Sequence, residues 1–104
     1  MNTQDQELIE MAAKACGMTV SEALSRIGKP VSLYPQWNPL EDDGDAFRLS
    51  VGLKINLQHD DADVWATTLD HDAIEPNTQD AYAATRRAIV RAAAAIGEQL
   101  EGNV

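Results

Sequence analysis

The residues best suited to chemistry are two histidines, each flanked by acids. They occur as His-Asp-Asp at 59–61 and as Asp-His-Asp at 70–72. Imidazole beside carboxylate is the combination found in metal sites and general bases. The hairpin predicted from strands at 54–58 and 64–69 would place His59 at its turn and His71 beyond its open end, roughly 20 Å apart at about 3.3 Å per residue. We therefore expect each histidine to be a solvated loop residue, and predict no metal site.

Two further clusters carry opposite charge. The acidic one surrounds Gly44 and consists of Glu41, Asp42, Asp43 and Asp45. It lacks the alternating ladder of oxygen ligands and the distant Glu of a calcium-binding EF-hand, so we predict a helix cap that also pairs with cations. The basic cluster consists of Arg86, Arg87 and Arg91. Pairing with the acids, a phosphate contact and a protein-docking surface all remain open for these arginines.

No constellation of residues indicates catalysis. The lone cysteine, Cys16, lies on an apolar helical stripe, which predicts a buried, unreactive thiol. The chain has neither a glycine-rich phosphate loop nor a nucleophile elbow. We expect a protein that is not an enzyme and needs no cofactor, in a reducing compartment such as the cytoplasm.

Charge is the strongest compositional signal. The 17 acids outnumber the 8 lysines and arginines, which gives a net charge of -9. Such a chain should repel free nucleic acid, whose binding depends on cations that neutralise phosphates, and should suit basic protein partners. The N-terminus has acids where a signal peptide is positive, and no apolar run approaches 18 residues. We predict no export signal and no membrane span.

The length of 104 residues predicts one domain over 1–104, with residues 1–3 and 101–104 frayed. Helices are predicted over 4–16 and 20–27, because capping-box spacings precede apolar residues at helical intervals. Residues 31–34 can form an edge strand. The segment 43–53 is ambiguous: its apolar residues alternate as in a strand, whereas its acids suit the first turn of a helix.

The second half of the chain predicts a hairpin and a long helix. Strands at 54–58 and 64–69 should pair, and a helix at 78–100 should start after Pro76 and Asn77. The stripe expected to pack on the sheet consists of Tyr82, Ile89, Ala93, Ile96 and Leu100. The prediction is an α+β fold with two short N-terminal helices, a β-hairpin with a possible third edge strand, and the long helix on the sheet.

The motif Trp-Asn-Pro-Leu at 37–40, the acidic run at 42–45 and the final helix with its three arginines resemble the phage ABA sandwich family of small phage and prophage proteins. The resemblance covers about two thirds of the chain. It implies a three-layer α/β/α sandwich with helices on both faces of the sheet, and it implies no activity. It also favours a helix over 43–53.

These observations lead to the hypothesis of a small phage or prophage accessory protein in the bacterial host cytoplasm that binds a host protein. One specific form is an acidic inhibitor of a bacterial defence system, of the anti-CRISPR type, directed at a basic, nucleic-acid-binding surface. The alternatives are a nucleic-acid-binding αβββα module and a self-associating structural or assembly protein, such as a homodimer. The partner-binding candidates are Trp37, Glu41, Asp42, Asp43, Asp45, Asp60, Asp61, Asp63, Arg86, Arg87 and Arg91.

Overall fold

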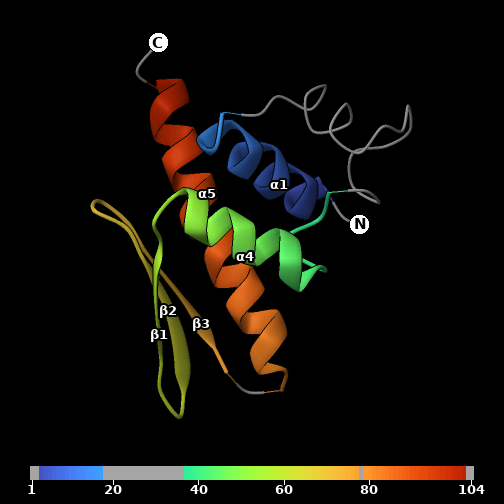
Figure 1. Cartoon of the computed structure of the whole chain (residues 1–104), viewed down its shortest axis with the longest axis vertical. Coiled ribbons are helices and arrows are strands. Elements are labelled where there is room, and N and C mark those ends of the chain that lie inside the picture. Colours follow the sequence, from blue (N-terminus) through green and yellow to red (C-terminus); the bar gives the residue numbers. More distant parts are fainter. Residues whose placement is uncertain (1–2, 18–36, 78, 103–104) are drawn as a thin grey trace.

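The fold is α+β, and the computed structural model describes residues 3–17, 37–77 and 79–102 (Figure 1). Its elements are α1 (Thr3–Ala15), α4 (Asp43–Gly52), β1 (Asn56–His59), β2 (Asp63–Thr67), β3 (Asp72–Pro76) and α5 (Ala81–Gly102). The strands form one antiparallel sheet in the order β1-β2-β3, and α5 packs on it. The predicted fold class and hairpin are confirmed. The predicted helix at 20–27 and edge strand at 31–34 lie outside the described residues.

The face of the sheet toward α5 is apolar, because side chains on a strand alternate between the two faces. Val64 and Ala66 of β2 are completely buried, and Ala73, which pairs with Ala66 from β3, is buried beside them. Trp65 and its neighbour Ile74 point to the opposite face. The described residues place no helix on that opposite face, so the two-sided arrangement implied by the family resemblance is not seen in this part of the chain.

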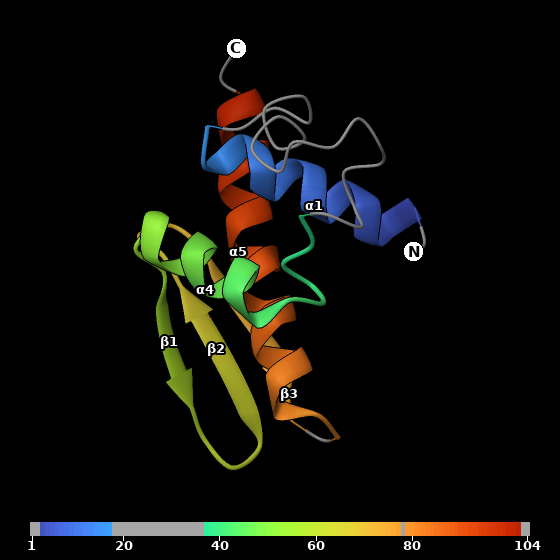
Figure 2. The same cartoon turned by 45° about the vertical axis from the view of Figure 1, so that its right-hand side comes forward.

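Helix α1 packs against α5, and the two helices approach closely (Figures 1 and 2). Its buried residues are Ile9, Ala12 and Ala13, which share one helical face. The contact on α5 includes Gly97: a Cβ placed on this glycine would lie 2.0 Å from the carbonyl oxygen of Met11. The crossing therefore requires a residue without a side chain at position 97.

Helix α4 confirms the helical interpretation of 43–53. Asp42 is its N-cap, and the Asp42 carboxylate accepts a hydrogen bond of 2.8 Å from the backbone N–H of Asp45. At the other end Lys54 has a φ of 56°, and the N–H of Ile55 donates to the carbonyl of Ser50. This left-handed residue turns the chain from the helix into β1.

Strand β3 occupies a segment for which the sequence analysis predicted only the approach to a helix, so that prediction is wrong. Pro76 suggested the start of a helix, but it is the last residue of an edge strand, where a missing N–H costs no ladder bond. Helix α5 begins only at Ala81, where the Asp80 carboxylate accepts bonds from the N–H groups of Tyr82 and Ala83.

The apolar stripe predicted for the long helix is correct in its centre and wrong at its ends. Ile89 and Ala93 are buried, whereas Tyr82 is 72% and Leu100 is 53% exposed. A helix of 22 residues is about 33 Å long at 1.5 Å per residue, whereas the strands of five residues reach only about 17 Å. The ends of the stripe therefore extend beyond the sheet.

The two histidines lie at opposite ends of β2, as predicted. His59 pairs with Val64 beside the β1–β2 turn, and His71 lies in the β2–β3 turn, where its ring is hydrogen-bonded to Gln99 at 2.9 Å. Within the described ranges, no group of three or more His, Cys, Asp or Glu side chains is arranged to hold a metal ion. None of the helices in those ranges is long and apolar enough to cross a lipid bilayer.

Candidate functional site

An open groove lies between α4, β1 and the first half of α5. Its volume is about 370 Å³, which is within the size range of ligand sites. Phe47 of α4, Leu57 of β1 and Tyr82 of α5 line it, and they are 66%, 38% and 72% exposed. Large apolar side chains that gather at the surface from three separate elements are typical of an interaction site.

The groove exists because the sheet is wider than the helix that covers it. Helix α5 packs on β2 and β3, and all four residues of β1 are exposed. Leu57 pairs with Ala66 and His59 with Val64, so their side chains face the same side of the sheet as α5. The inward face of β1 thus forms the floor of the groove, and α4 and α5 form its walls.

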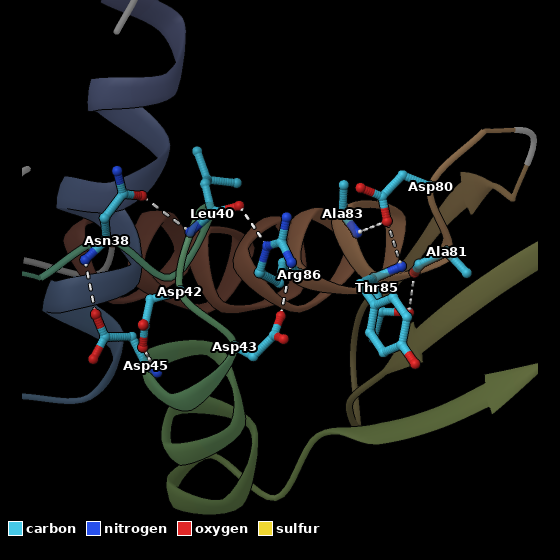
Figure 3. A network of polar contacts seen from close by, with 11 residues as sticks. Asn38, Leu40, Asp42, Asp43, Asp45, Asp80, Ala81, Ala83, Thr85 and Arg86 are labelled. Atoms are coloured by element: carbon cyan, nitrogen blue, oxygen red, sulfur yellow. Dashed lines mark hydrogen bonds and ion pairs between the residues drawn. The ribbon is translucent and has the colours of Figure 1, made fainter.

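A polar network fixes the wall formed by α4 and α5 (Figure 3). Arg86 of α5 donates from Nε to the carbonyl oxygen of Leu40 and from a terminal nitrogen to the Asp43 carboxylate, both at 2.7 Å. The Arg86 side chain is only 15% exposed, whereas that of Asp43 is 70% exposed. Arg86 therefore holds the segment before α4 against α5, and Asp43 presents negative charge at the rim of the groove.

The other two arginines of the basic cluster form separate ion pairs. Arg87 donates to Asp5 of α1 at 3.1 Å. Arg91 pairs with Glu75 of β3 and also donates to the carbonyl oxygen of Ile74 at 2.9 Å. Of the three readings left open, intramolecular pairing is the one that the structure supports. Among these three arginines, Arg86 is the one that pairs with the predicted acidic segment.

The acids around Gly44 differ in their roles. Asp42 caps α4, and Asp45, whose side chain is 13% exposed, accepts bonds from the backbone N–H of Asn38 and from Arg48. Glu41, Asp42 and Asp43 are all exposed. The solvent-facing negative charge in this segment therefore comes mainly from these three residues.

The other acidic candidates, Asp60, Asp61 and Asp63, lie in and beside the turn between β1 and β2. The Asp60 carboxylate accepts bonds from the backbone N–H groups of Asp63 at 2.7 Å and Ala62 at 2.9 Å. These bonds, with one from the Trp65 side chain, hold the pKa of Asp60 below its usual value. Asp61 is exposed, and Asp63 is the first residue of β2. The turn is thus organised around an ionised Asp60, one residue beyond His59 in the groove.

The aromatic residues at the surface differ from the one that the sequence analysis selected. Trp37, a partner-binding candidate of the sequence analysis, is partly buried and packs against the core. Among the described residues, the exposed aromatics are Phe47 and Tyr82, which the sequence analysis assigned to apolar patterns. A helical projection could have found Phe47, since the buried residues Ala46 and Leu49 of α4 are three apart and Phe47 lies off their stripe.

No family model matches this chain, and neither the curated proteins nor the solved structures include a significant match. The resemblance to the phage ABA sandwich family therefore stays a prediction.

Proposed function

We propose that this protein is a non-enzymatic binding module that takes an apolar and positively charged segment of a partner protein into the groove. The observation that carries the proposal is the exposure of Phe47, Leu57 and Tyr82 around that one groove. Aromatic side chains that become buried at the centre of an interface supply most of its binding energy. These three residues are the expected anchors.

Charge supports a basic partner. The chain carries a net charge of -9, with Glu41 and Asp43 near one wall of the groove and Asp60 and Asp61 beyond the end of β1. Complementary charge accelerates association and excludes partners of the same sign. Binding should therefore weaken as salt is added, because exposed charges are screened within about 10 Å at 0.1 M salt.

The biological setting of the proposal is a phage or prophage accessory protein that acts on a host protein in the bacterial cytoplasm. Its specific form is an inhibitor of a bacterial defence system, of the anti-CRISPR type, that occupies a basic nucleic-acid-binding surface. The acidic composition and the sequence resemblance support this setting. A plaque assay on a host with an active CRISPR system tests it: the protein should restore phage growth, and unchanged restriction would contradict the inhibitor form.

Affinity capture from host lysate, compared across matched variants, tests the binding function itself. The groove variant carries Phe47→Ser and Tyr82→Ser, which replace exposed side chains and should leave stability within about 1 kcal/mol of wild type. The control is Leu69→Ser, since Leu69 is fully exposed and does not line the groove. A basic protein retained by wild type and control but lost by the groove variant supports the proposal. Equal retention by all three contradicts it.

A nucleic-acid-binding module is the second candidate, because α4-β1-β2-β3-α5 follows the helix, three strands and helix order of double-stranded RNA-binding domains. The third strand of this order is β3, in a segment for which the sequence analysis predicted no strand. The pairing of Arg86, Arg87 and Arg91 with acids opposes this candidate. Electrophoretic mobility shifts with double-stranded RNA at low salt should show no complex, and a stable complex would favour this candidate.

A further inference from the structure

The backbone of β1 has unpaired hydrogen-bonding groups along its outer edge. The N–H of Asp60 donates to the carbonyl oxygen of Asp63 at 3.0 Å, which marks that pair as hydrogen-bonded. Bonded and non-bonded pairs alternate along an antiparallel ladder. Gln58, two residues before Asp60, is therefore hydrogen-bonded to β2, whereas the N–H and C=O groups of Leu57 and His59 point away from β2. No hydrogen bond from the described residues reaches these outward groups.

The opposite edge of the sheet is partly blocked. The N–H of Asn77 donates to the carbonyl oxygen of Ala62 at 2.8 Å, and the same alternation turns Asp72, Ile74 and Pro76 of β3 outward. Arg91 donates to the outward carbonyl of Ile74 at 2.9 Å, and Pro76 has no N–H to offer. A cation and a proline are common protections against unwanted strand pairing. Strand β1, with the sequence Asn-Leu-Gln-His, contains no Lys, Arg, Asp, Glu or Pro.

We propose that the partner segment in the groove binds in an extended conformation, as a fourth strand paired with β1 through the outward groups of Leu57 and His59. This inference rests on the proposed function and specifies how the same groove is used. In strand addition, backbone hydrogen bonds hold the peptide and alternate side chains enter pockets. Here the inward side chains of the new strand would contact Leu57 and Phe47, both of which line the groove.

Both views support an accessible edge, since β1 lies at the outside of the described fold and no described element lies beyond it (Figures 1 and 2). The preferred segment alternates apolar and basic residues, because the groove is apolar and Asp60 and Asp61 follow β1 directly. A second copy of the chain would bring a further charge of -9. The charge therefore favours a basic partner over self-association.

The test uses a fluorescent octapeptide of alternating lysine and valine, titrated by fluorescence anisotropy at low salt. His59→Pro removes an outward N–H without removing a bond to β2, and His59→Ala removes the imidazole but retains that N–H. His59→Pro should bind the peptide about tenfold more weakly than His59→Ala, as expected when one backbone hydrogen bond is lost. The same peptide with alternate backbone nitrogens methylated keeps its charge but cannot pair, and should lose binding similarly.

Hydrogen exchange of the wild-type protein gives a second readout that does not depend on how the proline variant folds. Addition of the octapeptide should slow exchange of the Leu57 and His59 amides and leave that of Gln58 unchanged. Unchanged exchange at Leu57 and His59 despite peptide binding would overturn strand addition.

The remaining outcomes separate this inference from the proposed function. If His59→Pro and His59→Ala bind equally and the Phe47→Ser/Tyr82→Ser variant does not bind, the groove functions without strand pairing. If all variants bind as wild type does, or the peptide does not bind at all, the proposed function fails as well. A wild-type dimer in light scattering that His59→Pro abolishes would identify a second copy as the occupant and overturn the partner proposed here.

Discussion

Replacement of Gly97 by alanine should weaken the packing of α1 on α5. The added Cβ would lie 2.0 Å from the Met11 carbonyl oxygen and 2.9 Å from its carbonyl carbon. Both atoms belong to the backbone, so a rotamer change cannot relieve the contact. The helices must separate by about 1 Å or more, and a gap of that size forfeits a quarter to a half of the dispersion energy of the contacts that it opens.

The magnitude follows from two opposing effects. Overpacking typically costs about 1–3 kcal/mol, and a backbone clash belongs at the upper end of that range. Alanine in a helix is favoured over glycine by about 1 kcal/mol. We therefore expect Gly97→Ala to lower the free energy of unfolding by about 2 kcal/mol, which corresponds to a fall in melting temperature of roughly 8–16 °C for a domain of this size.

Thermal and urea unfolding followed by circular dichroism measures this effect. Gly52→Ala is the matched control, because no atom lies within 4 Å of the position that its Cβ would take, and it should unfold at or above the wild-type temperature. If Gly97→Ala proves as stable as wild type, the close crossing of α1 and α5 is wrong.

Four further substitutions test the described contacts by chemical denaturation or thermal melting. Arg86→Ala leaves the Leu40 carbonyl without its donor and should lower the free energy of unfolding by about 1–3 kcal/mol. Asp43→Ala should lower it by less than about 1 kcal/mol, because the Asp43 side chain is 70% exposed. Equal losses would contradict the role given to the carbonyl bond. Val64→Ala should cost about 2–3 kcal/mol, because Val64 is completely buried, and a cost below about 1 kcal/mol would place it outside the core. The pKa of Asp60 is lowered in the folded state. The ionised carboxylate therefore stabilises the fold fully when the pH is above the unfolded-state pKa of about 4. This stabilisation is lost as the pH falls through the lower pKa of the folded state. Asp60→Asn should therefore reduce the melting temperature at pH 7, and the difference from wild type should disappear in acid; a difference that persists at low pH would contradict this assignment.

Local signals in the sequence mark helix ends, although 43–53 stayed open between helix and strand until the family resemblance favoured a helix. The acids at the start of α4 and the glycine after α1 mark helix ends by their own chemistry: Asp42 caps the helix, and Gly17 adopts a φ of 80°. Strand β3 has a weaker local signal, since only Ala73 is buried within it and Pro76 suggested a helix start. Its position as a paired edge strand depends on β2, which no local pattern contains.

The groove could not be predicted from the sequence because it arises from a mismatch in size between elements. It requires that α5 cover β2 and β3 but not β1, and that α5 be longer than the strands it covers. Both conditions expose residues that have ordinary core character, Leu57 on the strand and Tyr82 on the helix. Apolar type and spacing are the same for such residues whether a partner or the core covers them.

Photocrosslinking in host lysate tests the groove as the binding site most directly. Benzoylphenylalanine placed at Phe47, 66% exposed in the groove, should crosslink to a basic host protein, and the same group at Leu69, exposed outside the groove, should not. Addition of salt to the lysate before irradiation should reduce the yield from Phe47. A crosslink from Leu69 but not from Phe47, or none from either position, would contradict the account.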